Sequence, residues 1–266
     1  MSASNSLRGR VPGQAVMNQV VAAQRVVSPR SRLSQLFGAS PLNPNTRALY
    51  RSALGELVVG DALDHIGPEW DILHVIPVAD NEEIDHLVIG PAGVFSIATE
   101  NFPGEDIWVG GETLLVGNRH DDGIPKAKRL AELASGILSE ASGHDVVVEP
   151  IIVVVDPQRL VLREQPSGLV VVSSKQLLRW LTKLERTLAG EEVARISDVA
   201  DRSTTWGSSA GSVADAEQLH RDFALIRDDV NNATRRRILW GIAAFVAVGI
   251  ACWVTTAIVV QNLLGH

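Results

Sequence analysis

At 266 residues, with 45% hydrophobic but only 5% aromatic residues, the chain can bury one medium-sized core built from aliphatic side chains. Its single cysteine, Cys252, excludes an internal disulfide. The net charge of −7 is unevenly spread: seven of the 24 Lys and Arg residues precede Glu56 but no acidic residue does, so a basic arm precedes an acidic body ill suited to broad phosphate binding.

Residues 1–45 are rich in Ser, Gly, Pro, Asn and Arg, a composition that predicts a disordered basic arm. The stretch "AVMNQVVAAQRVV" could instead form a helix on an anionic membrane surface. The seven arginines of the acid-free region could contact nucleic acid or anionic lipid: Arg8, Arg10, Arg25, Arg30, Arg32, Arg47 and Arg51.

Residues 46–190 are predicted to form an α/β domain. The leucine and valine spacing of "NTRALYRSALGELVVGDALDHIG" predicts a helix that ends at Gly67 and Pro68. Three strands follow, "WDILHVIPV", "EIDHLVIG" and "GVFSIATE", and the short pieces "IWVG" and "TLLVG" are expected to extend their meander.

The second half of this domain begins with a helix, "PKAKRLAELASGILSEASG", with Pro125 at its first turn. The β-branched run "DVVVEPIIVVVD" predicts a central strand, "GLVVVS" another strand, and "SSKQLLRWLTKLERTL" a helix. The order of helix, three strands, helix, two strands and helix is typical of a mixed α/β fold.

Residues 191–235 are predicted to form a linker and a juxtamembrane helix, with "STTWGSSAGS" as a loop. Four apolar residues then recur at helical spacing: Leu219, Phe223, Ile226 and Val230. This seam could support a homo-oligomer as a short coiled coil, could pack on the domain, or could lie along a membrane surface.

Residues 236–262 are predicted to form one transmembrane helix. Residues 238–260 carry no charge, and about 23 helical residues reach about 35 Å, enough to cross a hydrocarbon core of about 30 Å. Because the three arginines 235–237 precede this stretch, the positive-inside rule predicts a single-pass protein of the cell membrane with most of the chain in the cytoplasm.

Several segments together resemble the nuclease-related domain family, NERD, within the restriction-endonuclease-like superfamily. They are "GELVVGDAL", "EEIDHLVIGPAGVFSIATEN", "GEDIWV" and "IPKAKRLAELASGIL". The resemblance implies an αβββαβ core with a mixed sheet. It also implies metal ligands or catalytic residues at Glu56 of the first helix, Asp85 of the second strand, and a Glu-x-Lys motif on the third strand.

The third strand departs from that motif, because it reads Ala98-Thr99-Glu100-Asn101. Ala98 supplies no ligand oxygen, and Glu100 places a negative charge where the family has a lysine. The sequence therefore predicts a degenerate active site in a binding or scaffolding module that does not hydrolyse phosphodiesters.

The alternative is a Mg²⁺-dependent nuclease whose lysine has moved to the following helix. Lys126 and Lys128 are the candidates, and Lys128 is preferred. Glu56, Asp85 and Glu100 are three acids that could still bind Mg²⁺. His74 and His86 are expected to be core histidines, because no His or Cys cluster has metal-ligand spacing.

Overall fold

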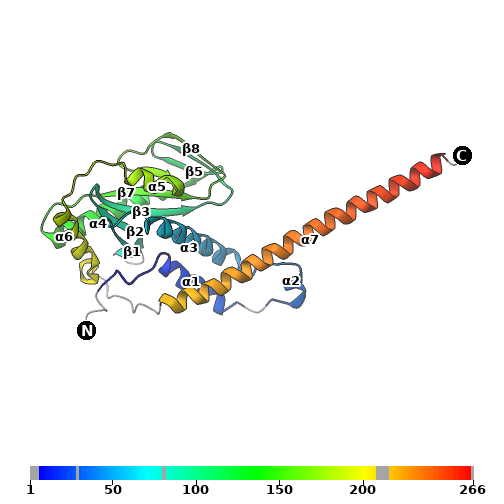
Figure 1. Ribbon diagram of the computed structural model, residues 1–266, viewed down its shortest axis with the longest axis horizontal. Helices are drawn as coiled ribbons and strands as arrows, with labels where there is room; N and C mark the ends of the chain where they lie inside the picture. Colours follow the sequence, from blue (N-terminus) through cyan, green and yellow to red (C-terminus); the bar gives the residue numbers. More distant parts are fainter. Residues whose placement is uncertain (1–5, 28–29, 80–81, 208–215, 265–266) are drawn as a thin grey trace.

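The computed structural model of the protein describes residues 6–27, 30–79, 82–207 and 216–264 (Figure 1). The helices are α1 (Gln14–Arg25), α2 (Arg32–Leu36), α3 (Pro44–Leu63), α4 (Gly123–Ser142), α5 (Ser174–Leu181), α6 (Gly190–Asp201) and α7 (Ala216–Leu264), with a 3-10 turn at Ser203–Trp206. The strands are β1 (Asp71–Ala79), β2 (Glu82–Gly90), β3 (Gly93–Asn101), β4 (Asp106–Gly110), β5 (Thr113–Val116), β6 (Arg119–Asp121), β7 (Val148–Val155), β8 (Arg159–Glu164) and β9 (Val170–Ser173). The predicted mixed α/β class is confirmed.

The central sheet has the strand order β1-β2-β3-β7-β9. Strands β1, β2 and β3 form an antiparallel meander, whereas β7 and β9 run parallel to β3. From α3 to β7 the chain therefore has the predicted mixed sheet, with α4 as the crossover before β7. Because β7 is paired on both sides and covered on both faces, its continuous β-branched run is fully buried from Ile151 to Val154.

Helices cover both faces of this sheet (Figure 1). On one face, Val59 and Leu63 of α3 pack with Phe95 and Ile97 of β3, joined by α5. On the other face, Leu130 of α4 and residues of α6 pack with strands β1 and β2. The alternation of side chains along each strand sends neighbouring residues to these two cores.

A second sheet, ordered β6-β5-β4-β8, corrects the expectation that β4 and β5 extend the meander. The turn after β3 redirects the chain, because the amides of Phe102 and Gly104 bond to the carbonyls of Val155 and Asp156. Strand β4 then pairs with β5 and with β8. The sequence analysis missed β8, whose "RLVLRE" lies at an exposed sheet edge.

The N-terminal region differs from the predicted disordered arm over the part of residues 1–45 that the structure describes. Met17 and Val20 of α1 are fully buried and pack in one cluster with Tyr50 and Ala53 of α3. Before α1, Leu7 is buried in the core that α4 and α6 share with the sheet. Apolar burial therefore attaches this segment to the folded body, whereas residues 1–5 and 28–29 lie outside the described residues.

The region predicted as a linker begins with α6, which packs on the sheet through Val193 and Ile196. The 3-10 turn follows, where Trp206 is buried and donates from Nε1 to the carbonyl of Ala200 at 2.8 Å. The folded body therefore extends past residue 190. Residues 208–212, the rest of the predicted loop, lie outside the described part of the chain.

The first part of α7 packs on the same body. Leu219 and Phe223 are buried against α1 and α3, Ile226 and Val230 pack beside them, and the Phe223 and Tyr50 rings lie 5.5 Å apart. Of the three alternatives for this apolar seam, the structure has the seam packed on the domain. The homo-oligomer predicted through these residues would compete with this contact inside one chain.

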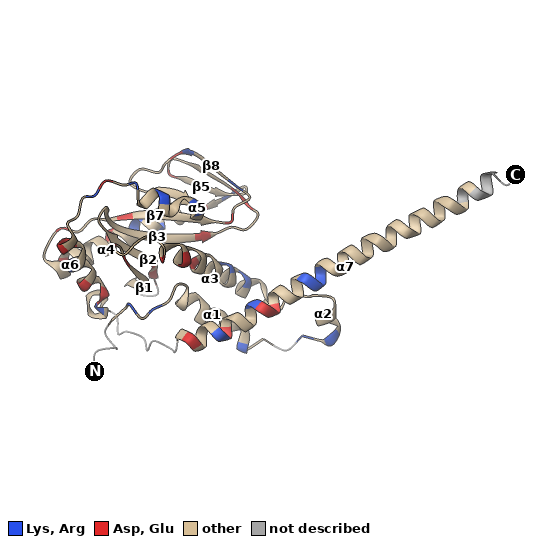
Figure 2. Ribbon diagram, viewed as in Figure 1, with Lys and Arg blue, Asp and Glu red and all other residues tan. Residues whose placement is uncertain are grey.

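The second part of α7 extends away from the body, with a charge-free stretch after a band of arginines (Figure 2). Its apolar side chains are exposed, for example Phe245 at 81% and Trp253 at 73%. Within the described residues, α7 is the one helix long and apolar enough to cross a membrane, with a mean hydropathy of 2.2 in its most apolar window. By length and composition it is a candidate membrane anchor.

Candidate functional site

A cavity of about 220 Å³ lies between β2, β3 and the start of α4. Its walls are formed by Ser52, Glu83, Ile84, Asp85, Ser96, Ile97, Ala98, Thr99, Glu100, Gly123, Lys126, Ala127 and Leu130. Three carboxylates and one lysine therefore meet one small space on the α4 side of the sheet.

Strand β2 contributes two of these carboxylates. Glu83 and Asp85 are two residues apart, so their side chains leave the strand on the same face. Asp85 Oδ2 accepts a hydrogen bond from the backbone amide of Thr99 at 2.6 Å. This carboxylate therefore joins β2 to β3 just beyond His86 and Ile97, the last pair of their ladder.

Strand β3 presents Ser96, Ala98 and Glu100 to the cavity, as the alternation of its side chains predicts. Ala98 packs its methyl group against the apolar cluster that includes Ile152 and Ala127. Glu100 lies at the first turn of α4, since a Cβ atom at Gly123 would be 3.6 Å from its Oε1. The positive end of that helix favours a carboxylate there.

Helix α4 places its two lysines in different surroundings. Lys126 lines the cavity, four residues before the buried Leu130 and thus on the same side of the helix. Lys128, the lysine preferred from the sequence, points elsewhere: its Nζ lies 2.6 Å from Glu112 Oε2 of the second sheet. The lysine that accompanies the carboxylates is therefore Lys126.

Glu56 of α3 does not line the cavity. Its side chain is 2% exposed and accepts hydrogen bonds from Ser52 Oγ, at 3.5 Å, and from the backbone of Gly13. A Cβ atom at Gly13 would lie only 3.6 Å from Glu56 Cβ. The N-terminal segment therefore covers the acid that the family resemblance assigns to the first helix.

Burial raises the pKa values of the carboxyl groups of Glu56, Asp85 and Glu100. Burial raises the pKa of Glu56 to about 9, with the charges of Asp85 and Glu83 acting in the same direction. Burial raises the pKa of Asp85 to about 6, and the amide of Thr99 opposes that rise. Burial also raises the pKa of Glu100 to about 7, aided by Asp121 and Asp85 and opposed by Lys126. At neutral pH, Glu56 is thus protonated and Glu100 is only partly ionised.

The donor set does not fit a divalent cation well. Among the described residues, no group of three or more His, Cys, Asp or Glu side chains converges closely enough to hold a metal ion. Asp85 accepts a hydrogen bond from the Thr99 amide, Glu56 lies beneath Gly13, and the Ala98 side chain has no oxygen. Glu56, Asp85 and Glu100 were predicted as Mg²⁺ ligands. The charge of Asp85 raises the pKa of both Glu56 and Glu100, but the three acids do not form one ligand cage.

A neighbouring depression, also of about 220 Å³, shares Ser52, Thr99 and Glu100 with the cavity. Its walls include two arginines, Arg51 of α3 and Arg119 of β6. Acidic and basic side chains are therefore adjacent on this side of the domain, although the body as a whole is acidic.

The two histidines are core residues, as predicted. His74 and His86 are buried, with their Nδ1 atoms 2.8 Å apart and their rings nearly perpendicular. Burial lowers the pKa of His74 to about 4, and that of His86 well below its usual value. Neither histidine lines the cavity.

The sequence analysis missed Glu83 as a cavity residue and ranked Lys126 below Lys128. The alternation of side chains could have found Glu83, since it shares a strand face with Asp85. The helical spacing of Lys126 to Leu130 could have found the lysine. The cover over Glu56 had no comparable signal, because it depends on a segment more than 40 residues away in the chain.

The fold and the cavity define an α/β domain with carboxylates from two adjacent strands beside a helix lysine. Residues 51–155, from α3 to β7, match the family model of the nuclease-related domain, NERD. No curated protein matches the chain, and no solved structure matches it either.

Proposed function

We propose that this protein displays its nuclease-related domain from a membrane anchor, and that the domain binds or scaffolds without hydrolysing phosphodiesters. The β3 face carries this proposal, because Ser96, Ala98 and Glu100 line the cavity where the family motif has a glutamate and a lysine. Removing one electrostatic contributor of this kind typically costs about 10²–10³ in rate, and here a ligand oxygen is missing as well.

The burial of Glu56 outside the cavity supports the same proposal. A carboxyl group with a pKa near 9, held under the N-terminal segment, is a poor ligand at neutral pH because ligation needs the ionised form. Asp85 serves as an acceptor for Thr99, which gives this acid a role in the fold. We derive no hydrolytic step from these residues.

The membrane part of the proposal depends on α7. Its apolar second half is long enough for one span, and arginines 235–237 precede it directly. By the positive-inside rule, the nuclease-related domain then faces the cytoplasm of a cell with this protein in its cell membrane. Flotation of the full chain with lipid vesicles, together with protease protection of its C-terminus, would test the span and its orientation.

Nucleic acid is the partner that we propose for the domain. Three arginines of the acid-free region already meet acids of the body: Arg8 pairs with Asp71, Arg25 with Asp222 and Arg30 with Asp229. In the described part of the chain, Arg47 and Arg51 of α3 form no such pair, and Arg51 lines the depression beside the cavity. Phosphate contacts through these two side chains would make binding weaken as salt is added.

The second candidate function is a metal-dependent nuclease with a relocated lysine. Lys126 favours it, because this lysine lines the cavity together with Asp85 and Glu100. A cation beside two carboxylates could hold an attacking water in position. The two functions differ in one measurable property, hydrolysis that depends on these residues.

The deciding experiment is a cleavage assay of the full chain in detergent micelles on labelled DNA and RNA with Mg²⁺ or Mn²⁺. The full chain is required because α1, α6 and the start of α7 pack on the domain. We expect no cleavage that Asp85→Ala removes. Cleavage lost in Asp85→Ala and in Lys126→Ala, but kept in the matched Lys128→Ala control, would establish the nuclease instead.

A further inference from the structure

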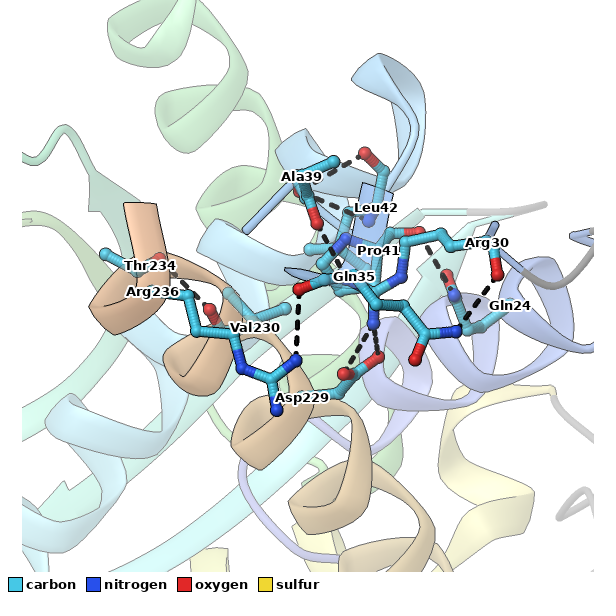
Figure 3. Close-up of polar contacts among 11 residues, drawn as sticks. Gln24, Arg30, Gln35, Ala39, Pro41, Leu42, Asp229, Val230, Thr234 and Arg236 are labelled. Atoms are coloured by element: carbon cyan, nitrogen blue, oxygen red, sulfur yellow. Dashed lines mark hydrogen bonds and ion pairs between the residues drawn. The ribbon is translucent and has the colours of Figure 1, made fainter. Parts of the chain in front are cut away.

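Residues 30–42, here named the α2 hairpin, are fastened to α7 where its charged part ends (Figure 3). Arg30 pairs with Asp229, and Arg236 Nη1 donates to the carbonyl of Gln35 at 3.0 Å. On the other side, Gln24 Nε2 of α1 donates to the carbonyl of Pro41 at 3.1 Å. The hairpin is therefore tied both to α7 and to the helix that packs on the domain.

The tip of the hairpin lies against the first turns of the apolar stretch of α7. Trp240 Nε1 donates to the carbonyl of Leu36 at 2.9 Å, and the Trp240 and Phe37 rings lie 5.0 Å apart. Gly38 approaches the helix so closely that a Cβ atom there would be 2.3 Å from the carbonyl oxygen of Ala233. Only glycine fits this contact, and its φ of +72° also favours glycine.

The outer side of this tip is apolar and exposed. Leu33, Leu36 and Phe37 are 67%, 50% and 53% exposed, and their spacing of three and four residues places them on one side of the helical turn. No charged residue occurs from Leu33 to Leu42. The exposed surface continues into Leu239 and Trp240 of α7, at 65% and 45% exposure.

We propose that the α2 hairpin is a second membrane contact, with Leu33, Leu36 and Phe37 inserted into the interfacial layer of an anionic bilayer beside the start of α7. This inference rests on the proposed membrane span. Tryptophan prefers the membrane interface, so Trp240 marks the height at which the hairpin tip lies. Arg32 of the hairpin and Arg235 and Arg237 of α7 are exposed near this height and fit anionic headgroups.

The bilayer is the occupant that continuity favours. The apolar side chains of the hairpin and of α7 form one continuous surface. The lipid that surrounds the span therefore also contacts the hairpin. Two membrane contacts fixed to each other restrain the tilt of the domain, since α1 joins the hairpin to the body. The NERD domain is then presented at a set orientation to the membrane surface.

A depth measurement on the full chain tests this inference. Cys252 is first replaced by serine, and Phe37→Cys or Leu33→Cys is labelled with bimane. The protein is reconstituted into phosphatidylcholine–phosphatidylglycerol vesicles with brominated acyl chains. Because interfacial apolar groups lie about 5–10 Å into the acyl boundary, bromine should quench about half of the fluorescence at position 37. Leu162→Cys on β8, which is also exposed, is the matched control and should keep its fluorescence.

The outcomes separate the hairpin from the anchor. If the full chain does not float with vesicles, the membrane span is absent and both proposals fail. If it floats but labels at 33 and 37 stay unquenched and open to aqueous quenchers, the span holds and the hairpin contact alone is overturned. Disulfide crosslinks between two chains of the unlabelled Phe37→Cys variant, with no lipid quenching of the labelled one, would overturn it too, because the surface would then bind a second copy.

Discussion

Charged side chains are arranged in opposite ways in the cavity and in the contact between α1 and α7. Around the cavity, Glu83, Asp85 and Glu100 face one another with Lys126 as the cation that lines it. Between α1, the hairpin and α7, ion pairs join arginine to aspartate, as with Arg25 and Asp222 and with Arg30 and Asp229. Acids of like charge are unfavourable unless something binds them, whereas complementary pairs suit a fixed structure.

The two regions therefore differ in how their charged groups are compensated. The α1–α7 contact combines paired charges with a buried apolar cluster, so it needs no partner beyond the chain itself. The cavity contains carboxyl groups whose pKa values burial has raised, a feature that is common in binding sites. The predictions below test this contrast.

The largest effect is expected from Phe223→Asp at the α1–α7 contact. The ring is 2% exposed and packs on Tyr50, so its loss together with a buried charge should lower the free energy of unfolding by about 3–5 kcal/mol. Thermal unfolding of the full chain in micelles measures this change. Leu225→Asp, at a position 69% exposed on the same helix, should change it little. Equal effects of the two variants would contradict the packing of α7 on the domain.

The next effect is the pH dependence of Glu100→Gln in the cavity. Burial raises the folded-state pKa of Glu100 to about 7, above its ordinary value of 4.5, so the ionised carboxylate destabilises the folded protein above pH 7. The glutamine variant should therefore be more stable there, on the order of 3 kcal/mol, and the difference should disappear as pH falls from about 7 to 4.5.

Chemical unfolding at a series of pH values checks this prediction. His74 and His86 have lowered pKa values, so they destabilise the fold as pH falls in an overlapping range. Both histidines are present in the wild-type protein and in the glutamine variant, so their contribution cancels in the difference between the two. The groups that face Glu100 are Asp121, Asp85 and Lys126. A pH-independent difference would mean that Glu100 is solvated, and the cavity would then lack the like-charge character assigned to it.

A smaller effect should separate Asp85→Ala from Asp85→Asn. Asparagine keeps an oxygen for the Thr99 amide, whereas alanine leaves that buried amide without its 2.6 Å partner. We expect alanine to be less stable than asparagine by about 1–2 kcal/mol. Equal stabilities, measured by denaturant unfolding at pH 7, would remove the structural role of Asp85.

Most of the central sheet could be predicted from the sequence because its signals are local. Alternation gave β1, β2 and β3, and the β-branched run gave β7. The second sheet was harder to predict, because β4 pairs in parallel with β8, which lies about 50 residues later in the chain. The helix α1 was underrated because its apolar side chains are stabilised by α3 and α7, which a composition argument does not consider.

The residues of the site also divide into those that local sequence patterns predict and those that depend on distant segments. Asp85 and Glu100 follow from strand alternation and the family resemblance, and both line the cavity. The sequence analysis preferred Lys128, but Lys126 is the lysine that lines the cavity, whereas Lys128 pairs with Glu112 in the turn between β4 and β5. The burial of Glu56 could not be predicted, because a segment expected to be disordered provides the cover.

The smallest effect concerns the pair between Arg25 and Asp222, which tests whether the paired charges of the α1–α7 contact matter individually. Their atoms are 3.2 Å apart, and the Arg25 side chain is 73% exposed, so water and salt screen the attraction. A double-mutant cycle with Arg25→Ala and Asp222→Ala should give a coupling below about 1 kcal/mol that shrinks as salt is added. The cycle is needed because Asp222 also accepts a bond from Gln218, which the single variant would disrupt. A coupling of several kcal/mol would show that charge pairing, rather than the burial of Phe223 and its neighbours, holds α7 to the domain.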